Sequence, residues 1–239
     1  MRASAIRIAT YNLQKCVGLD LRRRPDRTMR VINDLRADVV VLQEADKRIP
    51  PRPAALPHEM IEEDGWRILP FGAPGGSLGR HGNAMLVRQD VVIERMSHLN
   101  LPGLEPRGAI LADIAIGAQP LRIVGLHLGL IRRHRLLQVS VIMRMLHREP
   151  ARPTILAGDF NDWGNGAALD ATAQGFTFAR TGPSFPAPRP IARLDRFALS
   201  PDLMTLATGV HSSRPARIAS DHLPVWIEIA PAMVSRRAS

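Results

Sequence analysis

Residues able to do acid–base or cation chemistry recur at the ends of strand-like segments in this sequence. The stretch LAGDFNDW, residues 156–163, passes from an apolar strand directly into a carboxylate and an amide, Asp159 and Asn161. Any one such residue is well explained as a turn former or as a hydrogen-bonded structural histidine. Their recurrence predicts a single active site built from strand-end residues: Asn12, Glu44, His127, Asp159, Asn161, Asp195, Asp221 and His222.

The segments that must position these residues are mostly strands. Helical spacing is convincing only around residues 26–36 and 133–147, where Leu137, Val141 and Met145 recur on one face. Pieces rich in Pro and Gly predict loops at residues 50–57, 72–80, 101–108 and 183–190. Apolar or alternating runs predict two packed sheets flanked by helices, with strands at 6–11, 38–43, 83–87, 109–116, 121–126, 154–158, 195–200 and 223–229.

Length and charge predict one domain with an anionic partner. The chain has 239 residues, 45% of them hydrophobic, and no linker divides residues 1–239 into two domains. The net charge of +10 favours nucleic acid, phospholipid head groups or other phosphates as partners. Nearly all of this charge is arginine, which genome base composition explains equally well. The positions of the arginines therefore carry more weight than their number.

Cysteine usage and hydropathy predict the compartment. Cys16 is the only cysteine, which excludes an internal disulfide framework. Strand-like sequence follows the first residues too soon for a signal peptide, and no apolar run approaches the about 20 residues that a membrane-spanning helix needs. We expect a cytoplasmic monomer with no integral membrane segment.

The order of the motifs resembles the endonuclease/exonuclease/phosphatase superfamily, which includes deoxyribonuclease I, abasic-site endonucleases, sphingomyelinases and inositol-polyphosphate 5-phosphatases. TYN, LQE, GDFN, RLD and SDHLPV follow in the family's order between residues 8 and 227. The segments NLQKCVGLD, GRHGNAMLVR, PRGAIL and HLGL further resemble a small bacterial subgroup. The resemblance implies an α/β fold, a four-layered α/β sandwich of two packed mixed β-sheets flanked by helices, with the site at one edge of the sheets.

The resemblance also implies a divalent-metal-dependent phosphodiesterase that uses Mg²⁺ or Mn²⁺. Cleavage of a phosphodiester requires charge neutralisation on its oxygens, a nucleophile in line with the leaving group and stabilisation of the departing oxygen. Glu44 offers hard oxygen ligands, and Asn12 and Asp221 match family positions near the metal. Asp159 can orient or deprotonate water, while Asn161 can donate its amide to a phosphate oxygen.

Two histidines match catalytic positions of the family. Asp195 matches the acid that hydrogen-bonds the catalytic histidine, here His222. Water could lose its proton to His222 or to Asp159, and the sequence leaves both open. His127 stands where abasic-site endonucleases have tyrosine, and Gln14 stands where they have an acid. Both differences weaken the hypothesis that this protein is an abasic-site repair enzyme. Deoxyribonuclease I and sphingomyelinases have histidine at that first position, so His127 either binds the phosphate or, as we favour, protonates the leaving group.

Four further residues are expected to contact the substrate or orient the site. Asn83 matches the position of the acid that pairs with the equivalent of His127 in deoxyribonuclease I, although it could equally satisfy backbone groups. Arg107, Arg132 and Arg133 are the arginines best placed for phosphate, because a planar guanidinium suits that geometry. Trp163 could stack on a base, but a tryptophan beside a strand end more often packs.

Three functions remain open. The first is hydrolysis of nucleic acid, as an endonuclease or exonuclease, and the second is the same chemistry on a phospholipid head group or small phosphate ester. The third, a non-catalytic polyanion binder, is least favoured because a degenerate member would have lost ligands. The sequence lacks both a long apolar insertion for membranes and, with aromatics at 4%, an aromatic base platform. We favour nucleic acid.

Overall fold

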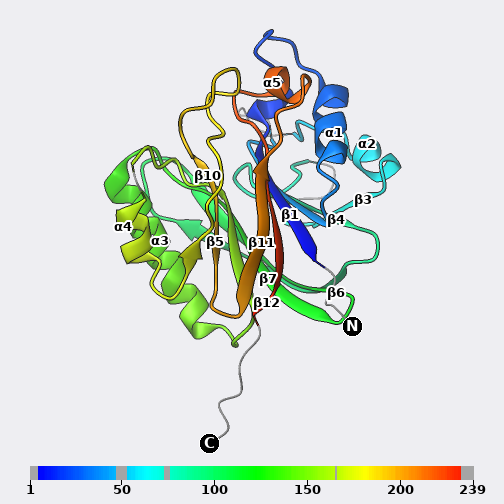
Figure 1. The fold of residues 1–239 in the computed structure, drawn as a ribbon. Helices are drawn as coiled ribbons and strands as arrows, with labels where there is room; N and C mark the ends of the chain where they lie inside the picture. Colours follow the sequence, from blue (N-terminus) through cyan, green and yellow to red (C-terminus); the bar gives the residue numbers. More distant parts are fainter. Residues whose placement is uncertain (1–4, 47–52, 73–75, 165, 233–239) are drawn as a thin grey trace, which may run out of the picture.

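Two six-stranded sheets form the centre of the protein, seen in a computed structural model that describes residues 5–46, 53–72, 76–164 and 166–232 (Figure 1). The first sheet has the order β11 (Leu203–Val210), β12 (Val225–Pro231), β1 (Ile6–Asn12), β2 (Val39–Gln43), β4 (Ala84–Arg88) and β3 (Trp66–Ile68). The second has the order β5 (Val92–Leu101), β6 (Arg107–Ile116), β7 (Gln119–His127), β8 (Thr154–Asp159), β10 (Asp195–Leu199) and β9 (Thr177–Phe178). Both sheets are mixed, because β1–β2 and β7–β8 pair in parallel and the other neighbours are antiparallel.

Helices cover the outer faces of the sheets. On the side of the first sheet lie α1 (Pro25–Asp34), α2 (His58–Glu63) and α5 (Ala216–Ala219) (Figure 1). The second sheet is covered by α3 (Arg132–Arg148) and α4 (Ala167–Thr172). A short 3-10 turn, η1 (Gln14–Cys16), follows β1. No helix in the described part of the chain is long and apolar enough to cross a membrane.

The alternation of side chains along the buried strands produces the apolar layers on both faces of each sheet. In β2, Val39 and Val41 point into the core between the sheets, whereas Val40 and Leu42 point to the helices of the first sheet. A third apolar layer packs Val124 of β7 against Ile142 of α3. Because side chains alternate with a period of two, each central strand serves two layers at once. The expected four-layered α/β sandwich is confirmed.

All the strands predicted from the sequence form, as do both helices, but the expectation of only two helices is wrong. The structure adds α2, α4 and α5, each only one to two turns long. The strands that the sequence did not reveal are β3, β5, β9 and β11, which are the edge strands of the two sheets. An edge strand has a single neighbour and exposed positions, so its sequence needs no continuous apolar pattern.

The predicted loops need one adjustment. Strand β5 continues to Leu101 and β6 begins at Arg107, so the loop expected at 101–108 is shorter than its Pro and Gly content indicated. Parts of the loops predicted at 50–57 and 72–80 lie outside the described residues.

Candidate active site

Strand pairing gathers the predicted site residues at one edge of the two sheets. In the second sheet His127 is the register partner of Asp159, which is in turn the partner of Asp195. In the first sheet Asn12 at the end of β1 lies beside Gln43, the last residue of β2 before Glu44. Parallel neighbours bring their carboxyl ends to the same edge, as in other open α/β sheets.

One carboxylate oxygen, Oδ2 of Asp159, lies at the centre of the group. It accepts a hydrogen bond of 3.2 Å from Nδ2 of Asn12, which crosses from the other sheet. The Nε2 atoms of His127 and His222 lie 3.5 and 3.8 Å from the same oxygen. The Asp159 side chain is only 1% exposed. The other oxygen, Oδ1, accepts the backbone N–H of Asn161 at 2.8 Å, which holds the carboxylate in place.

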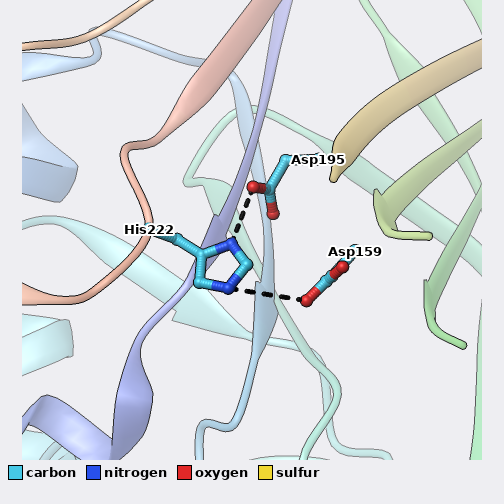
Figure 2. A group of neighbouring side chains, drawn as sticks. All are labelled: Asp159, Asp195 and His222. Atoms are coloured by element: carbon cyan, nitrogen blue, oxygen red, sulfur yellow. Dashed lines mark hydrogen bonds and ion pairs between the residues drawn. The ribbon is translucent and has the colours of Figure 1, made fainter. Parts of the chain in front are cut away.

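His222 lies between two carboxylates (Figure 2). Its Nδ1 is 2.8 Å from Oδ2 of Asp195, a fully buried residue at the start of β10. Ser184 donates its hydroxyl to the same Asp195 oxygen at 2.5 Å. With Nδ1 bound to Asp195, Nε2 is the ring nitrogen that points toward Asp159 and the reaction space.

The surroundings of His222 favour its protonated form. Burial lowers the pKa of His222, but the charge and hydrogen bond of Asp195 and the nearby carboxylates of Asp159 and Asp221 outweigh burial and raise this pKa to about 10. The ring is therefore protonated near neutral pH, and its Nε2 carries a hydrogen that it can donate to an oxygen.

His127 has the opposite electrostatic environment. Burial lowers its pKa to about 3, and the attraction of Asp159 only partly opposes this, because Arg107, His222 and Lys15 add positive charge nearby. A neutral imidazole can donate one N–H to an oxygen but carries no additional proton. This supports the oxygen-binding role for His127 over the role of leaving-group acid that the sequence favoured.

A cavity of about 380 Å³ opens beside these groups. Its wall includes His127, Glu44 and Arg107, together with Lys15 and Leu130. The ammonium of Lys15 forms a close ion pair with Oε2 of Glu44. Lys15 and Glu44 have φ angles of 58° and 50°, in the left-handed region that such residues rarely occupy. Unfavourable backbone geometry of this kind concentrates at functional sites.

The structure offers two places for the expected cation. The Lys15 ammonium already binds the Glu44 carboxylate inside the cavity. The oxygens of Glu44, which are hard ligands, therefore already bind a cation at this place. Separately, Asp159, Asp195 and His222 offer ligand atoms within 4.8 Å of one another. In that second group Nδ1 of His222 is engaged by Asp195. Glu44 is therefore the better fit to a hydrated Mg²⁺ or Mn²⁺.

The remaining predicted metal ligands lie nearby but are engaged with protein groups. Oδ1 of Asn12 accepts the backbone N–H of Gln14 at 3.1 Å. Asp221 is half-buried, and its Oδ1 accepts the Ser220 hydroxyl at 3.3 Å. The backbone N–H of Asp221 donates to Oε1 of Gln14 at 3.1 Å, which ties the segment before β12 to the turn after β1.

The predicted substrate contacts differ in their placement. Asn161 has a φ of 51° and donates Nδ2 to the carbonyl of Leu128 at 2.9 Å, which leaves one amide hydrogen for a ligand. Asn83 is fully buried and donates to the carbonyl of Gly108 at 2.8 Å, while its Oδ1 has no partner among the described residues. No hydrogen bond joins Asn83 to His127 among the described residues, and the pairing that the resemblance implied stays a prediction.

The three predicted arginines occupy two environments. Arg107 lines the cavity and pairs with Glu105 at 2.6 Å. Arg132 and Arg133 are exposed at the start of α3. A buried arginine of the same helix, Arg135, turns inward to the carbonyl of Leu130 and to Asp162, so it supports the loop after β7.

Sequence reasoning missed several supporting residues. Lys15 lies within the segment NLQKCVGLD and Ser184 within a predicted loop, but only their contacts with Glu44 and Asp195 identify their roles. Phe185 packs its ring 4.8 Å from the ring of His222, and Trp163 packs edge-on against Phe185 at 5.6 Å. Trp163 remains 61% exposed, so it packs on one side and faces solvent on the other.

Known proteins share this fold and sequence pattern. YbhP of Escherichia coli K12, an uncharacterized protein, is 28% identical over 222 residues, covering 83% of this chain and 85% of YbhP. The D. rerio TDP2 structure with a single-strand DNA product has a TM-score of 0.72 at 17% identity and covers 95% of this chain and 100% of its own. A mannosyl-6-phosphatase from Bacteroides thetaiotaomicron has a TM-score of 0.71 at 19% identity, with 94% and 99% covered.

The model of one protein family matches nearly the whole folded region. The match extends over residues 9–222, from β1 to His222, which precedes β12. Members of this superfamily are metal-dependent hydrolases of phosphoesters. The chain therefore belongs to the endonuclease/exonuclease/phosphatase family.

Proposed function

We propose that this protein is a divalent-metal-dependent phosphodiesterase that hydrolyses its substrate by in-line attack of water. The observation that carries the proposal is the convergence of Asn12, His127 and His222 on a single oxygen of Asp159. Such a buried set of an acid, an amide and two imidazoles can bind an anionic ester, orient water and accept a proton within one small space.

In this proposal Asp159 orients the attacking water and accepts its proton, while the protonated His222 donates Nε2–H toward the reacting oxygens. The geometry supports this division, because Asp195 holds Nδ1 of His222 and leaves Nε2 toward Asp159. Asp195 also stabilises the imidazolium of His222. His127 and Asn161 donate N–H groups to the nonbridging oxygens.

Glu44 would hold the metal ion, with Asn12 and Asp221 nearby. When bound, the cation supplies positive charge to the phosphate oxygens. Loading the site would displace the Lys15 ammonium from Glu44. Arg107 adds a second positive charge to the cavity wall.

For the substrate we propose nucleic acid as the first candidate. The net charge of +10 supports it, as does the similarity of fold to the DNA-bound TDP2. A phospholipid head group or small phosphate ester is the second candidate, and two observations favour it. The cavity of about 380 Å³ suits a single phosphate ester group, and its lining includes the exposed apolar side chain of Leu130.

A substrate panel tests both candidates on one preparation with Mg²⁺ or Mn²⁺. It contains single- and double-stranded DNA, RNA, phospholipids and bis(p-nitrophenyl) phosphate. If nucleic acid is the substrate, its cleavage should weaken steeply with salt because counterions are released on binding, whereas the small diester should respond far less. Cleavage of no phosphoester by wild-type protein, under conditions where the fold is intact, would refute the proposal.

A further inference from the structure

Several large apolar side chains are exposed in the loops at the end of the sheets that carries the candidate active site. Leu130 is 62% exposed and also lines the cavity. The backbone N–H of Ile191 donates to the carbonyl of Phe185, whose ring packs on His222. Leu104 directly precedes the cavity residues Glu105–Arg107. We call six such residues the apolar rim: Leu21, Leu104, Leu130, Ile131, Trp163 and Ile191.

Figure 1 shows two of the rim segments, the loop after β1 and the loop before β10, at the same end of the sandwich. The loop after β1 (blue), the helix α5 (orange) and the loop before β10 (yellow) lie together at that end. A hydrogen bond from the backbone N–H of Leu19 to the carbonyl of Ile218 joins the first of these loops to α5. By contrast, Val92 and Met204 are exposed at positions paired with Ala115 and Ala230, toward the opposite ends of their sheets.

Folding does not explain the rim side chains. Leu21 is 87% exposed and has a φ of 59°, where a leucine is less favourable than glycine or asparagine. Leu104 is 79% and Ile191 72% exposed, so neither contributes much to a core. Exposed apolar side chains that gather at one end of a protein and serve no core indicate an interaction surface.

Arginines are interleaved with the rim. Within the described residues the acids at this end already have partners: Asp20 pairs with Arg27, and Asp162 with Arg135 and Arg196. Six exposed arginines have no side-chain hydrogen bond or ion pair to a described residue, and we call them the rim arginines: Arg22, Arg23, Arg132, Arg133, Arg189 and Arg193. The surface therefore combines apolar groups with uncompensated positive charge.

We infer that the apolar rim and the rim arginines form a docking face for an anionic phospholipid bilayer. Aliphatic side chains enter the boundary between head groups and acyl chains, while arginines attract the anionic head groups. A groove for single-stranded nucleic acid would instead pair arginines with aromatic stacking surfaces, and Trp163 is the sole aromatic of the rim. Docking would present head-group phosphates to the cavity. This last step rests on the proposed function, whereas docking itself does not.

Vesicle co-sedimentation of the full chain tests the docking face. Chelator is present throughout, so binding is measured without hydrolysis. The vesicles contain phosphatidylcholine alone or equal parts of phosphatidylcholine and phosphatidylglycerol. The test variant is Leu21→Asn/Leu104→Ser/Ile191→Ser, and the matched control is Val92→Ser/Met204→Ser/Leu206→Ser, which removes exposed apolar groups from other surfaces. Thermal unfolding checks that both variants fold.

We expect wild-type protein and the control variant to bind the anionic vesicles, and the rim variant to bind about tenfold more weakly or worse. Trp163 provides a second readout, because its emission should move to shorter wavelength on docking. Trp66 is fully buried and Trp226 lies under the Arg7 guanidinium, so Trp163→Phe should remove most of this change.

Three results would overturn the inference. In the first, wild-type protein fails to bind anionic vesicles, or the rim and control variants bind them equally. In the second, the rim variant retains vesicle binding but loses binding to a single-stranded oligonucleotide. In the third, gel filtration shows a wild-type dimer that the rim variant dissociates, without vesicle binding. Docking without hydrolysis of any phosphoester after Mg²⁺ is restored would refute the proposed function and leave the docking face intact.

Discussion

Nδ1 of His222 lies 2.8 Å from Oδ2 of Asp195, while Nε2 of the same ring lies 3.8 Å from Oδ2 of Asp159. The ring thus connects an acid that holds it to an acid that faces the reaction space. Asp195 comes from β10 of the second sheet, and His222 precedes β12 of the first. The relationship depends on the packing of the two sheets.

The Asp195–His222 pair should act as a unit. We expect Asp195→Asn and His222→Ala each to lower kcat by about 10³-fold or more, and the double variant to lose little beyond the worse single variant. Ser184→Ala is the matched control, because it removes a hydrogen bond to the same Asp195 oxygen and leaves the His222 contact. The Ser184→Ala change should lower kcat far less than either of the other two changes. Losses that simply multiply in the double variant would show that the two residues work separately.

The Glu44 carboxylate should be required for metal-dependent hydrolysis. Chelation should abolish hydrolysis, and Glu44→Gln should both reproduce this loss and weaken Mn²⁺ binding measured by calorimetry, because a carboxylate supplies the charge that a hard cation requires. Glu105→Gln removes an equal charge from the same cavity wall, where Glu105 pairs with Arg107. It should leave Mn²⁺ binding nearly unchanged. Full activity in excess chelator would refute metal dependence.

His127 should stabilise charge on the phosphate without donating a proton to the leaving group. Burial lowers its pKa to about 3, so the ring is neutral near neutral pH. We expect His127→Ala to slow cleavage of a natural diester and of bis(p-nitrophenyl) phosphate by similar factors, each about 10²-fold. An alkoxide leaving group needs a proton far more than p-nitrophenolate does. A much larger loss on the natural diester would restore the general-acid role.

The glycine of GDFN should be essential for the approach of β7 to β8. A Cβ on Gly158, which has a φ of 154°, would lie 1.9 Å from the carbonyl oxygen of Leu126. Gly158→Ala should lower the free energy of unfolding by about 3 kcal/mol or more, measured by denaturant titration. Gly117, with a φ of 56° and open space around it, is the control, and Gly117→Ala should cost about 1 kcal/mol. Equal losses would contradict a steric role for Gly158.

The motifs and their order along the chain made much of the site predictable. Strands with continuous apolar sequence, such as β2 and β8, must be buried on both faces, so their ends must come together at one edge. The chemical types and order of Asn12, Glu44, Asp159 and His222 then indicated the family before any coordinates. The edge strands could not be found this way, because exposed positions follow no apolar pattern.

The sequence by itself determined the fold class, the family and the chemical groups available at the strand ends, since these follow from local apolar patterns and motif order. Only the tertiary structure decided how those groups act on one another. Burial and neighbouring charge shift the pKa values of the two histidines in opposite directions, to about 3 for His127 and to about 10 for His222. Lys15 contacts Glu44, and exposed apolar side chains and arginines lie in loops at the active-site end of the sheets, because distant segments come together only after the two sheets have packed.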